Sequence, residues 1–573
     1  MHPHPRRSLA LLLLAVAGCA PAAPGGPVAP ARAGWPFAGQ SRVAAGAQAM
    51  VVSGSPLASE VGRAILQRGG NAVDAAVAVG FALAVVHPEA GNVGGGGFML
   101  VRERGGAVHA LDYRETAPTG ATRDMYLDAQ GEPTDRSVTG HLASGVPGAV
   151  AGLAEAHRRF GRLPWRDVVE PAVRLAADGF VIDDYRHRSI AGAAERLRRF
   201  PASAAQFLPG GAAPAVGSTW RQPELATTLA AIRDRGAAGF YEGPVADLLV
   251  AEMQRGGGLI THDDLRRYRA IWRDPVVTRY RGHTVYSMAP ASSGGVTLAL
   301  ILNILEGTGP LPPFGSARLL HLEAEAMRRA FIERNRWLGD PDFVPLPLDR
   351  LLSRAYADSL RAGIGERATP TPAFDPGPRD GTSTTHYSVV DAEGNAVSCT
   401  TTLNNSYGSA VTVPGAGFLL NDEMDDFATA PGRPNMYGLV QGEANAIAPG
   451  KRMLSAMTPT LVLDPQGELR LVVGTPGGPT IITQVYHVIS NVLDHGMSLA
   501  DALAAPRTHH QALPDSLRVE RDGFAPATLD SLRTRGHGIM VRPKWGDVEA
   551  IIRTPRGWEG VSDPRLGGGG AGY

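Results

Sequence analysis

Thr384 is a candidate nucleophile because it lies where an irregular segment, residues 363–381, gives way to a β-forming run. A threonine hydroxyl is a weak nucleophile unless a base takes its proton, and the α-amine of an N-terminal threonine can be that base. Such an amine has an ordinary pKa of about 7.7–8.0. Thr384 gains it only if the bond after Ser383 is cut. Without that cut, a threonine at the start of a strand is an ordinary β-former.

The cut could be made by Thr384 itself. Its hydroxyl would attack the carbonyl carbon of Ser383, an ester would form by an N-to-O shift, and water would hydrolyse the ester. An exposed loop that leads into a strand provides suitable geometry, and residues 363–381 are rich in Pro, Thr and Asp with no periodicity.

Other residues that often carry chemistry lack the partners they need. His509 and His510 have no further ligand at metal-binding spacing, and His87-Pro88-Glu89 is typical of a helix end. The four-glycine run at 94–97 lacks the Lys-Ser/Thr of a phosphate-binding loop. We therefore expect no metal site.

Helices and hairpins must position Thr384. Apolar residues recur at helical spacing in 57–68 and 72–86, and a Gly-Gly pair joins β-forming runs at 98–102 and 107–113, so that Arg114 ends the second strand. Residues 147–274 are mostly helical in pattern. Further helices are expected at 297–305, 317–337 and 480–493, and further strands at 385–391, 395–403, 461–464 and 468–473. Helices on strands imply a layered α/β sheet.

The run from Thr384 to Asp391, followed by Gly394-Asn395-Ala396-Val397, resembles the small-subunit start of γ-glutamyltransferases. Other motifs of that family occur on both sides of this run, in the order typical of the family. They are Gly94 to Phe98, Arg114-Glu115 with Ala117-Pro118, Ser292-Ser293-Gly294-Gly295, Thr402-Leu403-Asn404, Gly417 with Leu419-Leu420-Asn421, Met424-Asp425-Asp426-Phe427, Pro434-Asn435, Ser455 with Met457 and Pro459-Thr460, and Pro476-Gly477-Gly478. They extend from about residue 50 to Tyr573. The chain is identified as a member of this family.

The resemblance implies an α/β (α+β) fold of the N-terminal-nucleophile hydrolase type, a four-layer αββα sandwich. It implies self-cleavage into a large subunit, 46–383, and a small subunit, 384–573, which form one heterodimer with one shared site. The implied reaction is ping-pong transfer of a γ-glutamyl group from a small molecule such as glutathione to water or an amino acid, without a cofactor.

The resemblance also implies roles around the nucleophile. Thr384 attacks the substrate, and the hydroxyl of Thr402 hydrogen-bonds Thr384 and orients it. The backbone N–H groups of Gly477 and Gly478 precede a helix, where unpaired amides can stabilise an oxyanion. Taken alone, this Pro-Gly-Gly run is also an ordinary turn.

Substrate-binding roles follow from the same resemblance. Arg114 pairs with the α-carboxylate of the γ-glutamyl group, because a guanidinium fork matches a planar carboxylate. Asn404, Glu423 and Asp426 hold the α-ammonium through acceptor oxygens. Ser455 binds the substrate carboxylate as well.

Two features bear on substrate choice. Relatives commonly carry two adjacent serines where this chain has Ser455 and Ala456, which puts one hydrogen bond of about 1 kcal/mol in doubt. The segment 430–447, with Tyr437, resembles a lid over the γ-glutamyl pocket. A lid favours small γ-glutamyl substrates over bulky acyl groups.

Composition excludes some classes of partner. The 573 residues carry 55 basic and 55 acidic side chains, and the arginines are scattered instead of forming a stripe. We therefore expect no nucleic-acid binding.

The N-terminus is typical of an exported protein. Residues 1–18 combine Arg6-Arg7 with an apolar run and resemble a lipoprotein signal peptide that ends before Cys19. Residues 19–45 are expected to form a flexible tether between a lipid on Cys19 and the folded domain. That lipid is the only membrane contact we expect. The protein is expected to be periplasmic or anchored to the outer membrane. An ordinary cleaved signal peptide is the alternative. If Cys19 carries lipid, Cys399 has no disulfide partner.

Two alternatives to γ-glutamyl transfer remain open at the sequence level. Ala456 motivates an acylase of the same fold that acts on cephalosporin side chains or poly-γ-glutamate. An inactive surface lipoprotein that binds γ-glutamyl compounds is the other, and the intact Thr384, Thr402 and Gly477-Gly478 set argues against it.

Overall fold

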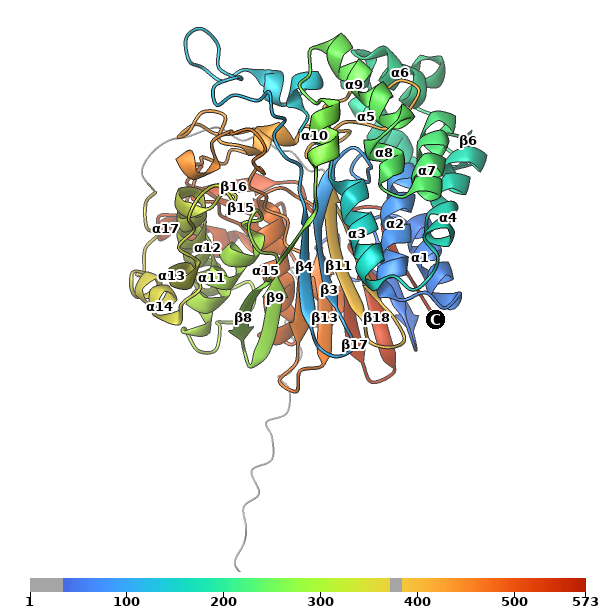
Figure 1. Cartoon of the computed structure of the whole chain (residues 1–573). Helices are drawn as coiled ribbons and strands as arrows, with labels where there is room; N and C mark the ends of the chain where they lie inside the picture. Colours follow the sequence, from blue (N-terminus) through green and yellow to red (C-terminus); the bar gives the residue numbers. More distant parts are fainter. Residues whose placement is uncertain (1–33, 372–383) are drawn as a thin grey trace, which may run out of the picture.

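Two antiparallel seven-stranded sheets form the centre of the molecule in the computed structural model, which describes residues 34–371 and 384–573 (Figure 1). In spatial order the first sheet is β19 (Gly569–Gly572), β2 (Met50–Ser53), β10 (Thr384–Val390), β11 (Ala396–Thr402), β3 (Gly96–Arg102), β4 (Val108–Tyr113) and β7 (Ile271–Arg273). The second sheet is β1 (Arg42–Gly46), β18 (Gly557–Ser562), β17 (Glu549–Thr554), β13 (Leu469–Gly474), β12 (Thr460–Leu463), β9 (His283–Ser287) and β8 (Val276–Tyr280).

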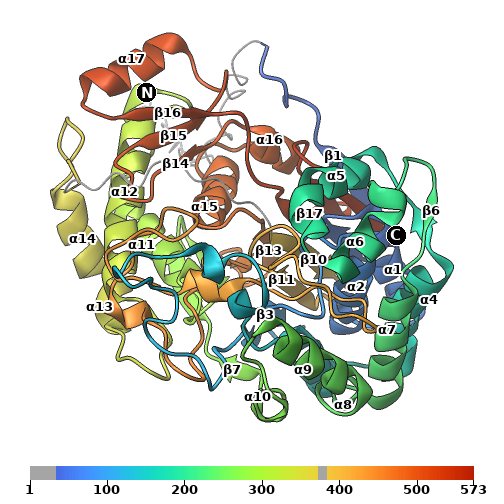
Figure 2. The same ribbon diagram turned by 90° about the horizontal axis from the view of Figure 1, so that it is seen from above.

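Helices cover the outer face of each sheet, as the view from above also shows (Figure 2). On the side of the first sheet lie α1 (Pro56–Gln67), α2 (Ala72–Val86), α3 (Ala149–Phe160), α4 (Trp165–Asp178), α5 (Asp184–Arg198), α6 (Pro201–Phe207), α7 (Pro223–Arg235), α8 (Ala238–Tyr241), α9 (Pro244–Gly256) and α10 (His262–Arg267). On the side of the second sheet lie α11 (Gly294–Glu306), α12 (Ala317–Trp337), α13 (Leu348–Leu351), α14 (Arg354–Ala362), α15 (Thr480–Leu493), α16 (Leu499–Ala504) and α17 (Pro526–Thr534). The order of layers is αββα, as the family resemblance implied.

Alternation along the strands separates the core between the two sheets from the core on the outer face of the first sheet. Phe98 and Leu100 of β3 pack with Val472 of β13 between the two sheets. Met99 and Val101, the intervening residues of β3, pack with α2 on the outer face of the first sheet. Since successive side chains of a strand point to opposite faces, a strand that is buried on both faces, such as β3, can be apolar at consecutive positions.

Two small sheets lie outside the two large ones. They are β5 (Phe180–Val181) with β6 (Thr219–Trp220), and the three-stranded group of β14 (Thr508–His509), β15 (Leu517–Glu520) and β16 (Ile539–Arg542).

A hairpin joins β10 to β11 and fixes their register. Asp391 accepts hydrogen bonds at Oδ1 from the N–H groups of Glu393 and Asn395, each at 2.9 Å, and Gly394 adopts φ +86°. Oδ2 of Asp391 accepts from the N–H of Ala72 at 2.9 Å, which ties the turn to the start of α2. The side chain thus organises the turn and docks it on the helix layer.

Both predicted subunits contribute strands to both sheets. The first sheet places β10, β11 and β19 of the 384–573 segment among β2, β3, β4 and β7. The second sheet likewise interleaves β12, β13, β17 and β18 with β1, β8 and β9. A cut before Thr384 would therefore leave the two chains joined by continuous sheets.

Most of the predicted elements are present. The helices at 57–68, 72–86, 297–305, 317–337 and 480–493 correspond to α1, α2, α11, α12 and α15, and the predicted hairpins correspond to β3–β4, β10–β11 and β12–β13. Sequence patterns missed β1, β2, β8 and β9 and the C-terminal strands β14 to β19. β1, β2 and β19 are short and pair with strands far away in the chain, so local patterns carry little information about them. β8–β9 and β17–β18 are local hairpins that the patterns did not reveal.

The predicted tether, residues 19–45, is wrong at its C-terminal end. Trp35 is 4% exposed, and its Nε1–H donates to the carbonyl of Ala504 at 2.7 Å. Arg42–Gly46 is strand β1, which pairs with β18 at the edge of the second sheet. This segment is therefore part of the folded body. The predicted signal peptide, Cys19 and the first part of the tether lie outside the described residues.

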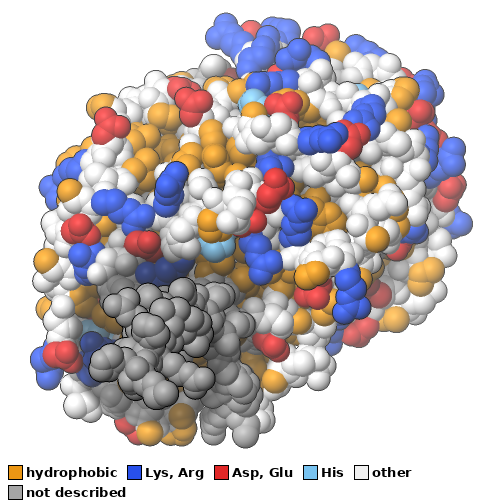
Figure 3. All heavy atoms as spheres, turned by 90° about the horizontal axis from the view of Figure 1, so that it is seen from below, with side chains coloured by type: hydrophobic (Ala, Val, Ile, Leu, Met, Phe, Trp, Pro, Cys, Tyr) orange, Lys and Arg blue, Asp and Glu red, His pale blue; other side chains and the backbone are white. Residues whose placement is uncertain are grey.

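The sequence also predicts an unpaired thiol at Cys399 and a surface without a basic stripe. Cys399 is buried and forms no disulfide. Within residues 34–371 and 384–573, no helix is both long and apolar enough to cross a membrane. On the face seen from below, basic and acidic side chains are interspersed (Figure 3).

Replacing Trp35 with Ala tests whether residues 35–46 belong to the folded body. Removing a buried tryptophan typically costs about 3–5 kcal/mol, so hydrogen exchange at the β1 amides should become markedly faster. Val43→Ala is the matched control, because Val43 is 53% exposed and the change should lie within about 0.5 kcal/mol. Equal exchange rates in wild type and Trp35→Ala would contradict the packing.

Candidate active site

Thr384 and Thr402 face each other across two adjacent strands. Thr384 begins β10 and Thr402 ends β11, and the two residues are directly paired in the antiparallel register. Oγ1 of Thr384 donates to Oγ1 of Thr402 at 3.2 Å. Oγ1 of Thr402 also accepts the N–H of Asn404 at 2.8 Å. The hydroxyl of Thr384 is therefore held in one direction by a side chain that is itself fixed by the backbone.

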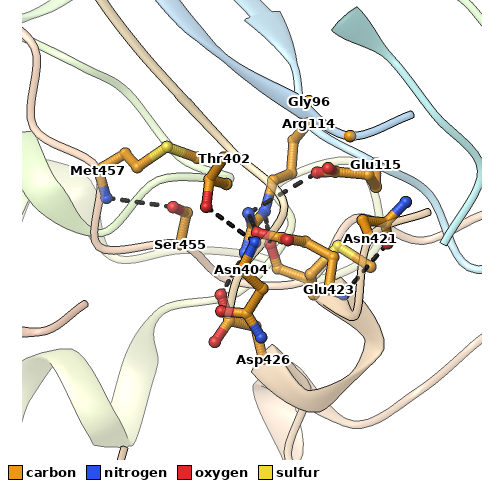
Figure 4. Close-up of polar contacts among 12 residues, drawn as sticks. Gly96, Arg114, Glu115, Thr402, Asn404, Asn421, Glu423, Asp426, Ser455 and Met457 are labelled. Carbon is orange, nitrogen blue, oxygen red and sulfur yellow. Dashed lines mark hydrogen bonds and ion pairs between the residues drawn. The ribbon is translucent and has the colours of Figure 1, made fainter. Parts of the chain in front are cut away.

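Arg114 forms the centre of a buried charged cluster. It follows β4 directly, and its N–H donates to Oδ1 of Asp112 at 3.0 Å. One end of its guanidinium donates to Glu423 and the other to Asp426, while Nε donates to the carbonyl of Met453 at 3.3 Å (Figure 4). Glu423–Asp426 is a short 3-10 turn that brings both carboxylates to Arg114.

A third carboxyl group, that of Glu115, lies beside this cluster. Its Oε2 is 3.7 Å from a guanidinium nitrogen of Arg114, and its carboxyl oxygens have no hydrogen-bond partner among the described residues. Gly96 makes room for it, since a Cβ there would lie 2.7 Å from Oε2 of Glu115 and 2.6 Å from the carbonyl oxygen of Tyr113. The motif Arg114-Glu115 marked this residue, but sequence reasoning gave it no role.

The cluster contains more acidic groups than one guanidinium can neutralise. Burial raises the pKa of Glu115 to about 8 and that of Glu423 well above its usual range, although Arg114 opposes both shifts. For Arg114, burial alone disfavours the charged form, but Glu423 and Asp426 raise its pKa overall. Since neighbouring buried carboxylates cannot all ionise, the group holds at least one proton at neutral pH. A ligand that brings its own ammonium would supply the missing positive charge.

Asn404 and Tyr437 connect the predicted lid to the site. Asn404 has φ +74°, and its Nδ2 donates to the carbonyl of Asp422 at 3.0 Å. The hydroxyl of Tyr437 lies 2.9 Å from the carbonyl oxygen of Asn404 and 2.8 Å from its Oδ1. The ring of Tyr437 also packs against Gly478, where a Cβ would lie 3.0 Å from Cδ1. The 430–447 segment therefore covers the site through its own buried tyrosine.

Ser455 is held by the Ser292-Ser293 segment. The carbonyl of Ser455 accepts the N–H of Ser293 at 2.8 Å and its Oγ–H at 2.5 Å, and Oγ of Ser455 accepts the N–H of Met457 at 3.1 Å. Nε of Arg334 donates to Oγ of Ser293 at 2.9 Å. Ala456 lies next to Ser455 with only a methyl group toward the cavity.

Gly477 and Gly478 lie at the start of α15. Gly478 is a lining residue of the cavity and Gly477 is not. The carbonyl of Gly477 accepts the N–H of Thr480 at 3.1 Å and its hydroxyl at 2.7 Å. Within the described residues, neither glycine N–H donates to a protein acceptor. These amides are therefore available to a ligand at the head of the helix.

One cavity collects the predicted residues. Every described residue to which we assigned a role lines it except Gly477; these are Arg114, Thr384, Thr402, Asn404, Glu423, Asp426, Tyr437, Ser455 and Gly478. The predicted scissile bond after Ser383 and the predicted lipidation site Cys19 lie outside the described residues. Among the described residues, no group of three or more His, Cys, Asp or Glu side chains could hold a metal ion.

Arg334 is a lining residue that sequence reasoning missed. It projects from α12, it is buried, and burial lowers its pKa to about 10 while Asp426 opposes the shift. Arg328, Arg329 and Arg336 lie in the same helix. Nothing in the spacing singles out Arg334, because only packing on the second sheet decides which arginine reaches the cavity.

Arg114→Met tests the charged cluster as a structural unit. Removing one partner of a buried ion pair typically costs about 3–5 kcal/mol, so the free energy of unfolding at pH 7 should fall by that amount in urea titrations. The deficit should shrink as the pH falls, because Glu423 and Asp426 then bind protons. Arg123→Met is the control: Arg123 pairs with Asp124 and Glu443 in solvent, and such pairs contribute about 0–1 kcal/mol. Similar losses in the two variants would contradict the cluster.

Comparisons with known proteins agree with this geometry. The sequence model of the gamma-glutamyltranspeptidase family matches residues 58–573. The glutathione hydrolase proenzyme of Escherichia coli (strain K12) is 47% identical over 526 residues, which cover 90% of each chain. The Acylase ACY 1 proenzyme of Pseudomonas sp. (strain V22) is 38% identical over 91% of this chain and 92% of that protein.

A solved structure extends the similarity to the fold. The cephalosporin acylase from Bacillus halodurans superposes with a TM-score of 0.82 at 29% identity, over 93% of this chain and 97% of the acylase. The match of the family model over nearly the whole chain, together with these relatives, assigns the chain. It belongs to the γ-glutamyltranspeptidase family.

Proposed function

We propose that this chain is a γ-glutamyltransferase and glutathione hydrolase that cleaves itself before Thr384. The observation that carries the proposal is the shared cavity. In it, the Thr384–Thr402 hydroxyl pair lies beside a buried cluster of Arg114, Glu423 and Asp426. A nucleophile and a set of groups for a small zwitterion are what transfer of a γ-glutamyl group requires.

The charged cluster matches the α-amino acid end of the donor. Arg114 would pair with the α-carboxylate, and Asn404, Glu423 and Asp426 would accept from the α-ammonium. Before the donor binds, Arg114 pairs with Glu423 and Asp426. When it binds, the ion pairs within the protein are replaced by ion pairs with the ligand, so no buried charge is left alone.

Acylation then follows at the γ-carbonyl. The free α-amine of Thr384 takes the proton of Oγ1, and the oxygen attacks the carbonyl carbon of the γ-amide. The N–H groups of Gly477 and Gly478 would stabilise the oxyanion, since the start of α15 offers unpaired donors. When the C–N bond breaks, the proton passes to the departing amine and a γ-glutamyl ester remains on Thr384. Water or a second amine then cleaves the ester.

Self-cleavage would use the same hydroxyl. Oγ1 of Thr402 is within hydrogen-bond distance of Oγ1 of Thr384 and can orient it for this step. Attack on the carbonyl of Ser383 would give an ester that water hydrolyses, leaving a large chain that ends at Ser383 and a small chain that starts at Thr384. The proenzyme names of the relatives support this route.

Export and a lipid anchor at Cys19 complete the proposal. They rest on the sequence of residues 1–19 alone. The folded body begins near Trp35, so residues 20–34 are the span available between an anchor and the domain.

An acylase activity is the second candidate, favoured by Ala456 and by the similarity to acylases. A glutaryl group differs from a γ-glutamyl group by the absence of the α-ammonium. A glutaryl group would leave Asn404, Glu423 and Asp426 without an ammonium to bind. We therefore expect kcat/KM for a γ-glutamyl anilide to exceed that for the glutaryl anilide at least tenfold. The opposite preference would favour the acylase.

Thr384→Ala should remain one chain in intact-mass analysis and should not hydrolyse a γ-glutamyl anilide. Both losses follow from the missing hydroxyl. Thr384→Ser is the control, because it retains a hydroxyl and should still give two chains. Cleavage or hydrolysis by Thr384→Ala would overturn the assignment of the nucleophile.

Ala456→Ser should improve binding of the donor. An added hydroxyl beside Ser455 can donate to the substrate carboxylate, and one such bond is worth about 0.5–1.5 kcal/mol. We therefore expect KM for the γ-glutamyl anilide to fall about 2- to 10-fold, measured in initial-rate assays. Ala129→Ser, at an exposed turn, should leave KM unchanged. An unchanged KM in Ala456→Ser would show that the hydroxyl does not reach the ligand.

A further inference from the structure

Arg334 brings a second guanidinium to the first cavity, the one that contains Thr384. It lies in the last turn of α12 and is 1% exposed. Nε donates to Oγ of Ser293 at 2.9 Å, and Nη1 donates to Oδ1 of Asn335 at 2.9 Å and to Oε1 of Gln441 at 3.4 Å. Within the described part of the chain, no carboxylate lies within ion-pair distance of it. Arg334 is therefore a buried cation whose hydrogen-bond acceptors are uncharged.

A buried guanidinium without an ion pair is an unfavourable arrangement. Burial lowers the pKa of Arg334 to about 10, so the side chain still carries its charge at neutral pH. Transfer of a charge out of water is costly unless an opposite charge and hydrogen bonds compensate for it. The neutral acceptors satisfy N–H groups of Arg334 but leave its charge unbalanced. The balancing charge must therefore come from groups further away in the cavity.

Asp426 is the carboxyl group that this charge can balance. Both residues line the cavity. Burial raises the pKa of Asp426, and Arg114 and Arg334 both oppose that shift. Hydrogen bonds also connect the two side chains through the segment 430–447, since Gln441 accepts from Arg334 and its Nε2 donates to the backbone carbonyl of Asp426 at 3.1 Å. Arg334 thus acts on Asp426 without forming an ion pair with it.

Most of the other titratable groups around Asp426 are acidic. They are Glu115 after β4, Glu423, Asp422 and Asp425 in or next to the 3-10 turn, and Tyr437 of the segment 430–447. Arg114 is a cation beside Asp426, but it also pairs with Glu423. Because the pKa of Glu115 is about 8, that group holds a proton at neutral pH. Two guanidinium groups then face two carboxylates, whereas Arg114 alone would leave one carboxylate protonated.

Arg334 also supports the other side of the cavity through Ser293. Oγ of Ser293, which accepts from Nε of Arg334, donates in turn to the carbonyl of Ser455, and the N–H of Ser293 donates to the same carbonyl at 2.8 Å. The next residue of α12, Asn335, accepts the N–H of Gly442 at 3.1 Å. The end of α12 therefore holds both the Ser455 segment and the segment 430–447.

We propose that Arg334 is a positioning residue for the γ-glutamyl donor: it balances the charge of Asp426, which would bind the α-ammonium, and holds Ser455, which would bind the α-carboxylate. This inference rests on the proposed function. The two guanidinium groups and two carboxylates form a site without net charge, which suits a zwitterion. A glutaryl group has no α-ammonium, so a negative Asp426 offers it no ion pair.

Arg334→Gln tests the charge in the full-length enzyme. Values of kcat/KM are measured against pH for a γ-glutamyl anilide and for the glutaryl anilide, and their ratio is followed. The chemistry at Thr384 is common to both substrates and cancels in that ratio. The ratio should fall on the acid side as Asp426 binds a proton. Since loss of a nearby cation makes protonation easier, we expect the midpoint of this fall to move up by about one pH unit in Arg334→Gln.

Three further variants separate the charge from the packing. Arg334→Lys keeps the positive charge and should keep the midpoint of wild type. Ser293→Ala keeps the charge but breaks the hydrogen-bond path to Ser455, so KM for both anilides should rise about 2- to 10-fold with no change in midpoint. Arg336→Gln is the matched control, because Arg336 is an exposed arginine of the same helix that stacks on Trp337, and it should change neither quantity.

The outcomes separate the inference from the proposed function. An unshifted midpoint in Arg334→Gln, or a wild-type ratio that does not fall on the acid side, would overturn the role of Arg334 alone. Failure of wild type to hydrolyse the γ-glutamyl anilide would overturn the proposed function and this inference with it. If Arg334→Gln does not fold, the other variants decide: a shifted midpoint in Arg334→Lys, or an unchanged KM in Ser293→Ala, would refute the inference.

Discussion

The antiparallel pairing of β10 with β11 is the constraint on which the site depends. Its register places Thr384 opposite Thr402, and the next pairing places Thr402 opposite Gly96 of β3. Strands β10 and β3 therefore begin, and β11 ends, at the same end of the first sheet. Because side chains alternate along a strand, a slip of one residue would turn Thr384 to the other face. The turn built by Asp391 at the opposite end of the hairpin prevents that slip.

The same register explains why Arg114 lies beside the nucleophile. Gly97 pairs with Tyr113 on β4, so Arg114, the next residue, lies at the end of the sheet where β10 begins. A side chain at Gly96 would collide with Glu115 and with the backbone of Tyr113. Glycine at position 96, the start of β3, is thus required by the close approach of Glu115 and Tyr113. It is not a flexible loop, since Gly96 and Gly97 are both paired in the sheet.

The extent to which the sequence predicts this structure varies with the range of the interactions involved. Helices such as Ala72–Val86 and the hairpin that begins at Thr384 depend on neighbours in the chain, and their patterns predict them well. The indole N–H of Trp35 donates to the carbonyl of Ala504, which is far away in the chain. No pattern near Trp35 predicts that hydrogen bond, so the segment was predicted to be a tether. The roles of Thr402, Asn404 and Glu423 came from family resemblance, because acceptor oxygens on a turn are common in solvent-exposed loops. The place of Arg334 in the cavity and that of Glu115 beside Arg114 depend on tertiary packing, which local sequence patterns do not reveal.

Thr384 lines two cavities whose other described lining residues differ. The first cavity is covered by Tyr437, whose hydroxyl is fixed on Asn404. A change at Ala456 would therefore act on the first cavity and leave the second unchanged, while the fixed ring of Tyr437 limits the size of the group that the first cavity can enclose.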